Sequence, residues 1–188
     1  MDFVQIIGPP AVGKMTVGQE LARLTGYKLL YNTMTADLLI DIFPRGTPQF
    51  GRLLSEIQTR IVEEAAKAGV SIINTAVWAM DSEGDTRVME ARQDAATRHG
   101  GTVYLVELYA PLDVRLDRNR HEHRARHKPK QQRTLTDEIM GDMETTWRMS
   151  SAGELDGRPR YLRIDNTEVP ADEAAQSICD AFGFAAAG

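Results

Sequence analysis

The chain has 188 residues, of which 42% are apolar and 26% are charged, as is typical of one globular domain. No apolar run approaches the ~20 residues that a membrane span needs, and the N-terminus lacks the basic start of a signal peptide. Cys179 is the only cysteine, which excludes an intrachain disulfide and favours a cytoplasmic location. The net charge of -5 argues against general nucleic-acid binding, and we expect neither a nucleic-acid nor a membrane partner.

Five short β-rich runs alternate with segments of helical periodicity along the chain. The predicted strands cover residues 4–7, 27–31, 70–73, 102–108 and 160–164. The predicted helices cover residues 14–24, 35–43 with Thr35 as the cap, 48–68, 82–99, a segment from Pro111, 136–150 and 170–182. This alternation predicts a five-stranded parallel sheet with helices on both faces, an α/β fold of three α/β/α layers. We expect a single domain over residues 1–188.

A glycine-rich segment follows the first predicted strand and leads into the first predicted helix. It fits the pattern G-x-x-x-x-G-K and reads Gly8, Pro9, Pro10, Ala11, Val12, Gly13, Lys14. Glycines allow the backbone to turn and to approach phosphate oxygens, and the amide N–H groups at a helix N-terminus attract anions. The lysine adds a cation directed toward the β- and γ-phosphates. The segment therefore predicts a P-loop that binds a nucleoside triphosphate, which we expect to be ATP.

The residue after the lysine departs from the usual pattern. A serine or threonine hydroxyl is expected there as a ligand of Mg²⁺, but the sequence has Met15, and the hydroxyl comes one place later at Thr16. Two outcomes follow. Mg²⁺ is held mainly by phosphates and water, with Thr16 contributing directly or through water, or the magnesium site is impaired.

Basic residues are concentrated in one stretch after the fourth predicted strand. Between Arg115 and Arg133 lie eight Lys or Arg residues against two Asp or Glu residues. The basic residues are Arg115, Arg118, Arg120, Arg124, Arg126, Lys128, Lys130 and Arg133. A local excess of six positive charges in an acidic chain predicts contact with an anion, although a solvated basic surface loop is the alternative.

The order of loop, helices, basic stretch and final strand–helix unit resembles the small P-loop kinases over nearly the whole chain. Lys-x-Thr at residues 14–16 is similar to the adenylate kinase loop, and residues 14–22 resemble the shikimate kinase pattern, with Met15 in place of serine. The same features also resemble those of kinases of the chloramphenicol phosphotransferase type. The resemblance implies a P-loop NTPase fold with a helical lid at about residues 118–135 and acceptor-side helices at about residues 33–68.

The same resemblance implies roles for individual residues in the basic stretch and after the last strand. Arg118 would pack on the adenine, and Arg124 or Arg126 would reach the transferring phosphoryl group, where preplaced cations stabilise spreading negative charge. The loop that contains Asn166 would contact the adenine, mostly through its backbone. A turn and helix cap is the alternative for the side chains of that loop.

Other candidates lie where the remaining strands end, because ligands in such sheets bind beyond the carboxyl ends of the strands. Asp37 is a candidate general base, or simply a first-turn carboxylate favoured by the helix dipole. Thr75 or Asn74 would act on Mg²⁺ through water, and Trp78 either lines a pocket or packs in the core. Arg45 and Arg52 are candidate clamps for an anionic acceptor.

These observations predict an ATP-dependent phosphotransferase that uses Mg²⁺ and acts on a hydroxyl or phosphate group of a small-molecule acceptor. We expect a monomer or a homodimer. Two alternatives stay open, a nucleotide-binding regulatory or switch protein and a weak NTP hydrolase. The altered magnesium position favours the first, whereas a dense basic lid that excludes water argues against the second.

Overall fold

The computed structural model describes residues 1–120 and 135–186. The strands are β1 (Asp2–Ile7), β2 (Lys28–Tyr31), β3 (Ile72–Thr75), β4 (Thr102–Tyr109) and β5 (Tyr161–Asp165). The helices are α1 (Lys14–Thr25), α2 (Asn32–Leu39), α3 (Pro48–Lys67), α4 (Glu83–Thr97), α5 (Leu112–Arg120), α8 (Asp137–Thr146) and α9 (Ala171–Phe182). Within the described part of the chain, no helix combines the length and the apolar character needed to cross a membrane.

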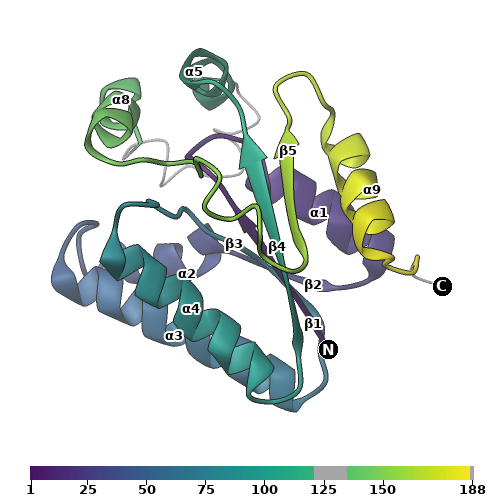
Figure 1. Ribbon diagram of the computed structural model, residues 1–188. Helices are drawn as coiled ribbons and strands as arrows, with labels where there is room; N and C mark the ends of the chain where they lie inside the picture. The colour runs from purple at the N-terminus through teal and green to yellow at the C-terminus, as the bar shows by residue number, and fades with distance from the viewer. Residues whose placement is uncertain (121–134, 187–188) are drawn as a thin grey trace.

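The five strands form one parallel sheet in the order β2-β3-β1-β4-β5. Helices α1 and α9 cover one face of the sheet, and α3 and α4 cover the other (Figure 1). Helices α5 and α8 lie beyond the carboxyl end of β4 (Figure 1). The predicted three-layer α/β/α architecture and its five-stranded parallel sheet are therefore confirmed.

Both faces of the sheet are apolar because helices cover both, as buried parallel strands require. On the face of α1 and α9, a core forms around Val4, Ile6, Val106, Leu21 and Ile178, and each of these side chains is fully buried. On the opposite face, separate clusters form around Phe3 and Val62 and around Ile7 and Met89. The central strand β1 thus contributes side chains to both layers.

Several predicted boundaries are wrong: α2 ends at Leu39 and not at residue 43, α8 ends at Thr146 and not at residue 150, and the starts of α2 and β3 also differ. Helix α2 begins at Asn32, directly after β2, with Tyr31 as its N-cap, and Thr35 lies buried inside the helix. The early start is possible because the Asn32 backbone N–H donates to Thr75 Oγ1 at 3.2 Å, a partner distant in sequence. The third strand covers residues 72–75 because its register pairs it with β1, where Ile6 lies opposite Thr75.

Unlike the predicted Thr35 cap, the predicted starts of three other helices are confirmed. The hydroxyls of Thr47, Ser82 and Thr136 each accept a hydrogen bond from the backbone N–H three residues later, at the starts of α3, α4 and α8. Pro111 precedes α5 by one residue, and its carbonyl accepts from Arg115 N at 3.1 Å. These starts are encoded within four residues, which is why the sequence predicts them.

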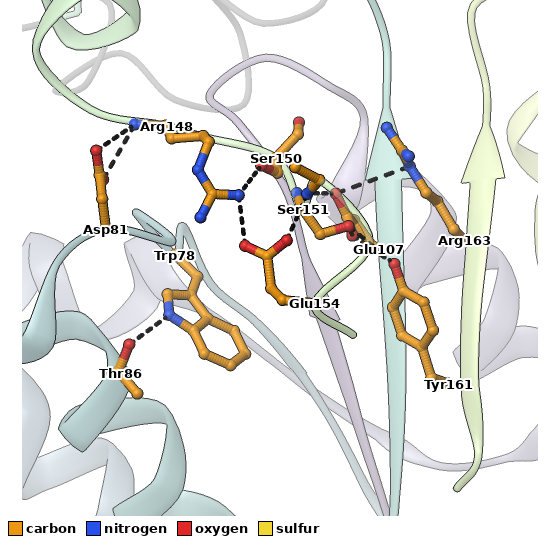
Figure 2. A network of polar contacts seen from close by, with 11 residues as sticks. Trp78, Asp81, Thr86, Glu107, Arg148, Ser150, Ser151, Glu154, Tyr161 and Arg163 are labelled. Atoms are coloured by element: carbon orange, nitrogen blue, oxygen red, sulfur yellow. Dashed lines mark hydrogen bonds and ion pairs between the residues drawn. The ribbon is translucent and has the colours of Figure 1, made fainter. Parts of the chain in front are cut away.

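The segment after α8 is tied to the sheet by a polar network (Figure 2). Glu107 of β4 is fully buried and accepts from Ser151 N at 2.8 Å, Ser151 Oγ at 2.5 Å and Tyr161 Oη at 2.6 Å. Arg148 pairs with Glu154, and its backbone N–H donates to both oxygens of Asp81 at 3.1 and 3.2 Å. The network holds the end of α8 against the loop that follows β3.

Candidate functional site

A cavity of about 590 Å³ lies beyond the carboxyl ends of the strands. Segments following all five strands contribute to its wall, as expected for a site in a parallel α/β sheet. The residues lining it are Pro10, Ala11, Val12, Gly13, Lys14, Met15, Thr16, Val17, Asn32, Thr33, Arg45, Thr75, Val77, Arg118, Leu135, Ile139, Met143, Asn166, Val169, Pro170 and Ala171. Most of the predicted phosphate loop is therefore on the cavity wall.

The backbone of the phosphate loop has the conformation that its glycines permit. Gly8 has φ 139°, and a Cβ there would lie 2.3 Å from Leu108 O, so only glycine lets the loop pass β4 this closely. Gly13 has φ 107° and precedes α1. Ala11 also adopts a positive φ, 62°, a conformation that L-residues other than Asn and Asp rarely adopt outside functional loops.

Lys14 folds over the loop that precedes it. Its Nζ donates to Gly8 O and to Pro9 O, both at 2.7 Å. Lys14 is also the first residue of α1, where the helix dipole favours an anion. A phosphate bound at this point would offer a full negative charge to Lys14 Nζ, whereas the two carbonyl oxygens offer only partial negative charges.

Arg118 and Asn166 join the phosphate loop to the segment after β5. Arg118 donates to Val12 O at 3.3 Å, to Asn166 O at 2.8 Å and to Thr167 O at 3.0 Å. Asn166 Nδ2 donates to Val12 O at 2.8 Å. Both predicted nucleotide-binding residues thus lie on the cavity wall beside the loop, and in this structure their donors are directed at backbone carbonyls.

The magnesium candidates occupy different positions. Met15 is half-buried and Thr16 is exposed, and both line the cavity. Thr75 lines the cavity and is almost completely buried. Asn74 lies away from the cavity, because its Nδ2 donates to Leu30 O at 3.1 Å and its Oδ1 accepts from Arg92 at 3.4 Å. Of the two predicted residues at the end of β3, only Thr75 is therefore placed at the site.

Arg92 is a buried cation of α4 behind this strand end. Its side chain is 3% exposed, and burial lowers its pKa to about 10, with the Asp85 charge acting in the opposite direction. It supports Asn74 and does not line the cavity. Arg92 is thus part of the packing beneath the site.

The acceptor-side predictions have mixed outcomes. Arg45 lines the cavity, while Arg52 forms an exposed pair with Glu56 at 3.9 Å. The Arg45 side chain is exposed overall, yet desolvation of its guanidinium lowers its pKa, and the neighbouring charge of Asp37 partly offsets this. Asp37 itself is half-buried and does not line the cavity.

Trp78 packs in the core and does not line the cavity. It is 4% exposed, and its Nε1 donates to Thr86 Oγ1 at 3.1 Å, as the close-up shows (Figure 2). The neighbouring Val77 lines the cavity in its place. Of the two readings of Trp78, the packed one is confirmed.

Ile139 and Met143 of α8 form an apolar part of the cavity wall that the sequence analysis did not assign to the site, and Leu135, the last residue of the predicted lid, also lines the cavity. The four-residue spacing of Ile139 and Met143 places both side chains on one face of the helix and could have indicated this wall. The predicted lid residues Arg124 and Arg126 lie outside the described residues.

No protein-family model matches the chain, and no curated protein matches it by sequence. Solved structures do match it. A sugar kinase from Janibacter sp. HTCC2649 is similar at TM-score 0.68 and 15% identity, over 98% of this chain and 96% of that chain. The tunicamycin resistance protein of Deinococcus radiodurans is similar at TM-score 0.61 and 20% identity, over 100% and 99%.

An APS kinase from Mycobacterium tuberculosis, solved in complex with AMPPNP and APS, is similar at TM-score 0.57 and 15% identity, over 97% of each chain. At these identities the likeness concerns the fold, and it extends over nearly the full length of each chain. The strand order β2-β3-β1-β4-β5 and the glycine loop after β1 agree with it. The chain has the three-layer P-loop fold of the small-molecule kinases.

Proposed function

We propose that the chain is an ATP-dependent phosphotransferase that transfers the γ-phosphoryl group of ATP to a hydroxyl or phosphate group of a small molecule. The observation that carries this proposal is the composition of one cavity. The phosphate loop forms one part of its wall, and Arg45, Asn32 and Thr33 form another. If ATP and the small-molecule acceptor bind in the same cavity, their reacting groups lie close together, as phosphoryl transfer requires.

The charges on the cavity wall support an anionic ligand. Lys14, Arg45 and Arg118 line the cavity, and none of its lining residues in the described part of the chain is Asp or Glu. In a partly enclosed site these cations attract phosphate more strongly than they would in open solvent. Lys14 would turn from the loop carbonyls to the β- and γ-phosphates, and Arg124 and Arg126 remain proposed partners of the transferring group.

Mg²⁺ fits the oxygen atoms that the cavity offers. Thr16 and Thr75 line it, and each carries a hydroxyl, which is a neutral oxygen ligand; the Thr75 hydroxyl also accepts from Asn32 N at 3.2 Å. Mg²⁺ commonly keeps several waters and takes phosphate oxygens, so it does not need a cage of protein carboxylates. When bound, the ion would neutralise charge on the β- and γ-phosphates, with Thr16 as its nearest proposed protein contact, directly or through water.

Asp37, on α2 beside the cavity residue Arg45, is the proposed general base. Asp37 is kept as a candidate because one of its carboxylate oxygens is buried without a hydrogen-bond partner among the described residues. Its charge is close enough to Arg45 to act on that residue's pKa. To accept a substrate proton, Asp37 would have to turn toward the cavity that Arg45 lines.

A nucleotide-binding regulatory protein is the second candidate. The specific observation in its favour is that the residue after Lys14 is Met15, which lines the cavity and offers no oxygen to a metal. Such a protein would bind ATP with little turnover. Weak hydrolysis of ATP, the third possibility, would give ADP at a rate that does not depend on any acceptor.

An acceptor screen separates these functions. The protein is incubated with ATP and Mg²⁺, and ADP release is measured against panels of sugars, nucleosides, hydroxy acids, phosphorylated small molecules and antibiotics. The proposal expects ADP release that depends on one acceptor class, together with a phosphorylated product detected by mass spectrometry. ATP binding without acceptor-dependent release would support the regulator, and equal release with and without acceptors would support the hydrolase.

A further inference from the structure

Two peptide units of the phosphate loop are held on their carbonyl side by residues from other elements. Arg115 Nη1 of α5 donates to Pro10 O at 3.4 Å. Asn166 Nδ2, after β5, donates to Val12 O at 2.8 Å, where Arg118 adds a second donor at 3.3 Å. These contacts join residues that are 105 and 154 positions apart in sequence.

The carbonyl contacts determine where the neighbouring N–H groups point. In a trans peptide the C=O and N–H point in opposite directions, and the described residues contain no cis peptide. Fixing Pro10 O on Arg115 therefore directs the Ala11 N–H away from α5, and fixing Val12 O directs the Gly13 N–H away from Asn166. Ala11 and Gly13 both line the cavity.

The two prolines make these N–H groups especially important. Pro9 and Pro10 have no amide hydrogen, so after Gly8 the next backbone donor of this loop is the Ala11 N–H. A phosphate bound at the start of α1 would therefore depend mainly on the amides of residues 11–15. Each oriented N–H contributes a charge-assisted hydrogen bond to the phosphate.

Arg115 is itself held rigidly. Its side chain is 2% exposed, its Nε donates to Ala110 O at 2.9 Å, and its Nη2 lies 2.7 Å from Glu144 Oε2 of α8. A buried guanidinium with a paired charge and fixed backbone partners has little freedom to move. Arg115 does not line the cavity and would reach a ligand only through the loop.

We infer that Arg115 and Asn166 are positioning residues that hold the phosphate loop so that the Ala11 and Gly13 N–H groups are already directed at a bound phosphate. The inference rests on the proposed function only in requiring that this loop binds phosphate. It assigns Arg115 a role in ligand binding through Pro10, although its side chain is separated from the cavity. The Glu144 carboxylate would keep the guanidinium in place.

The test measures the binding of inorganic tripolyphosphate and of adenosine separately, by isothermal titration and by ligand-observed NMR. Arg115→Met and Asn166→Ala are compared with Arg23→Met as the control. Arg23 lies in the last turn of α1, at the end of the helix away from the phosphate loop, and its Nε lies 2.9 Å from Glu20 Oε2. Arg23→Met therefore removes the same charge and an Arg–Glu ion pair without touching the loop or the predicted lid.

Arg115→Met and Asn166→Ala should each weaken tripolyphosphate binding on the order of ten- to hundredfold, the effect of losing one oriented hydrogen bond to a charged group. Adenosine binding by Arg115→Met should stay within about twofold of wild type, and Arg23→Met should change tripolyphosphate binding less than about threefold. If Arg115 and Asn166 only stabilised the fold, the variants would have lower melting temperatures and would bind tripolyphosphate and adenosine more weakly by similar factors.

Tripolyphosphate binding that is unchanged in both variants, or lowered equally in Arg23→Met, would overturn the inference while leaving the proposed function intact. If wild type itself does not bind tripolyphosphate or ATP, the proposed function and the inference both fail. Melting curves show whether each variant is folded at the temperature of the titration. Where Arg115→Met does not fold, the comparison of Asn166→Ala with wild type decides.

Discussion

Gly13 lies beside the segment after β5, next to the Val12 carbonyl that this segment contacts. A Cβ at this position would lie 3.1 Å from Asn166 Nδ2, the atom that donates to Val12 O. The φ of 107° is also one that L side chains rarely adopt. The backbone conformation therefore favours glycine here, and a Cβ would in addition press on the Asn166 side chain.

Gly13→Ala should lower the free energy of unfolding by about 1–3 kcal/mol, because the variant must either strain its backbone or shift it. ATP affinity should fall by at least about tenfold, since the shift moves Asn166 and turns the amides of the loop. Chemical denaturation measures the first quantity, and titration of the folded variant with ATP measures the second.

Gly51→Ala is the matched control. Gly51 lies inside α3, and a Cβ there would meet nothing within 4 Å. The substitution should raise the free energy of unfolding by about 0.5–1 kcal/mol, because alanine loses less backbone entropy in a helix. If Gly13→Ala behaves like Gly51→Ala in both measurements, the account of the loop conformation is wrong.

At the scale of elements, β4 and β5 are joined to the segment after α8 through one buried carboxylate. Glu107 accepts hydrogen bonds from Ser151 and from the Tyr161 hydroxyl, and Arg163 of β5 lies 3.9 Å away (Figure 2). Burial and the hydrogen bond to Glu107 raise the pKa of Tyr161 from 10.0 to about 12. The protonated tyrosine is therefore the form that the folded protein stabilises.

Tyr161→Phe should lower the free energy of unfolding at pH 7 by about 1 kcal/mol, because Glu107 loses one of its donors. The folded pKa is higher than the unfolded one, so this contribution is complete below pH 10 and is lost as the pH rises through about 12. The difference between wild type and variant should thus shrink between pH 10 and 12 in urea titrations. A difference that grows over this range would contradict the assignment.

Elements whose signals are local were predictable from the sequence, and those that depend on distant partners were not. The starts of α3, α4 and α8 follow from capping hydroxyls at Thr47, Ser82 and Thr136. The start of α2 depends on the Thr75 hydroxyl, which accepts from Asn32 N across 43 positions of sequence. No local pattern carries that information.

At the scale of the whole molecule, the same division applies to the candidate site. The phosphate loop was predictable because its glycines, its lysine and its place between a strand and a helix are contiguous. The contacts of Arg115 with Pro10 and of Asn166 with Val12 were not, because they depend on how β4 and β5 are ordered beside β1. Asp37 is a prediction from position along the chain that the structure does not place at the cavity: it follows the end of β2, as expected of a site residue, but it does not line the cavity.

The fold brings segments after all five strands to one cavity, and this arrangement is what turns a phosphate-binding loop into a proposed transfer site. Lys14 and Arg45 line the same cavity from α1 and from the loop between α2 and α3. The whole proposal depends, however, on the triphosphate being bound at the loop. Binding of ATP is therefore the property to measure first.

Isothermal titration of ATP with Mg²⁺ into wild type and into Lys14→Ala is the most direct measurement. The account predicts that wild type binds one ATP per chain and that Lys14→Ala, with its melting temperature retained, binds it at least about tenfold more weakly, because a charge-assisted contact to the phosphates is lost. Equal affinity of the two proteins for ATP, or no binding by wild type, would contradict it.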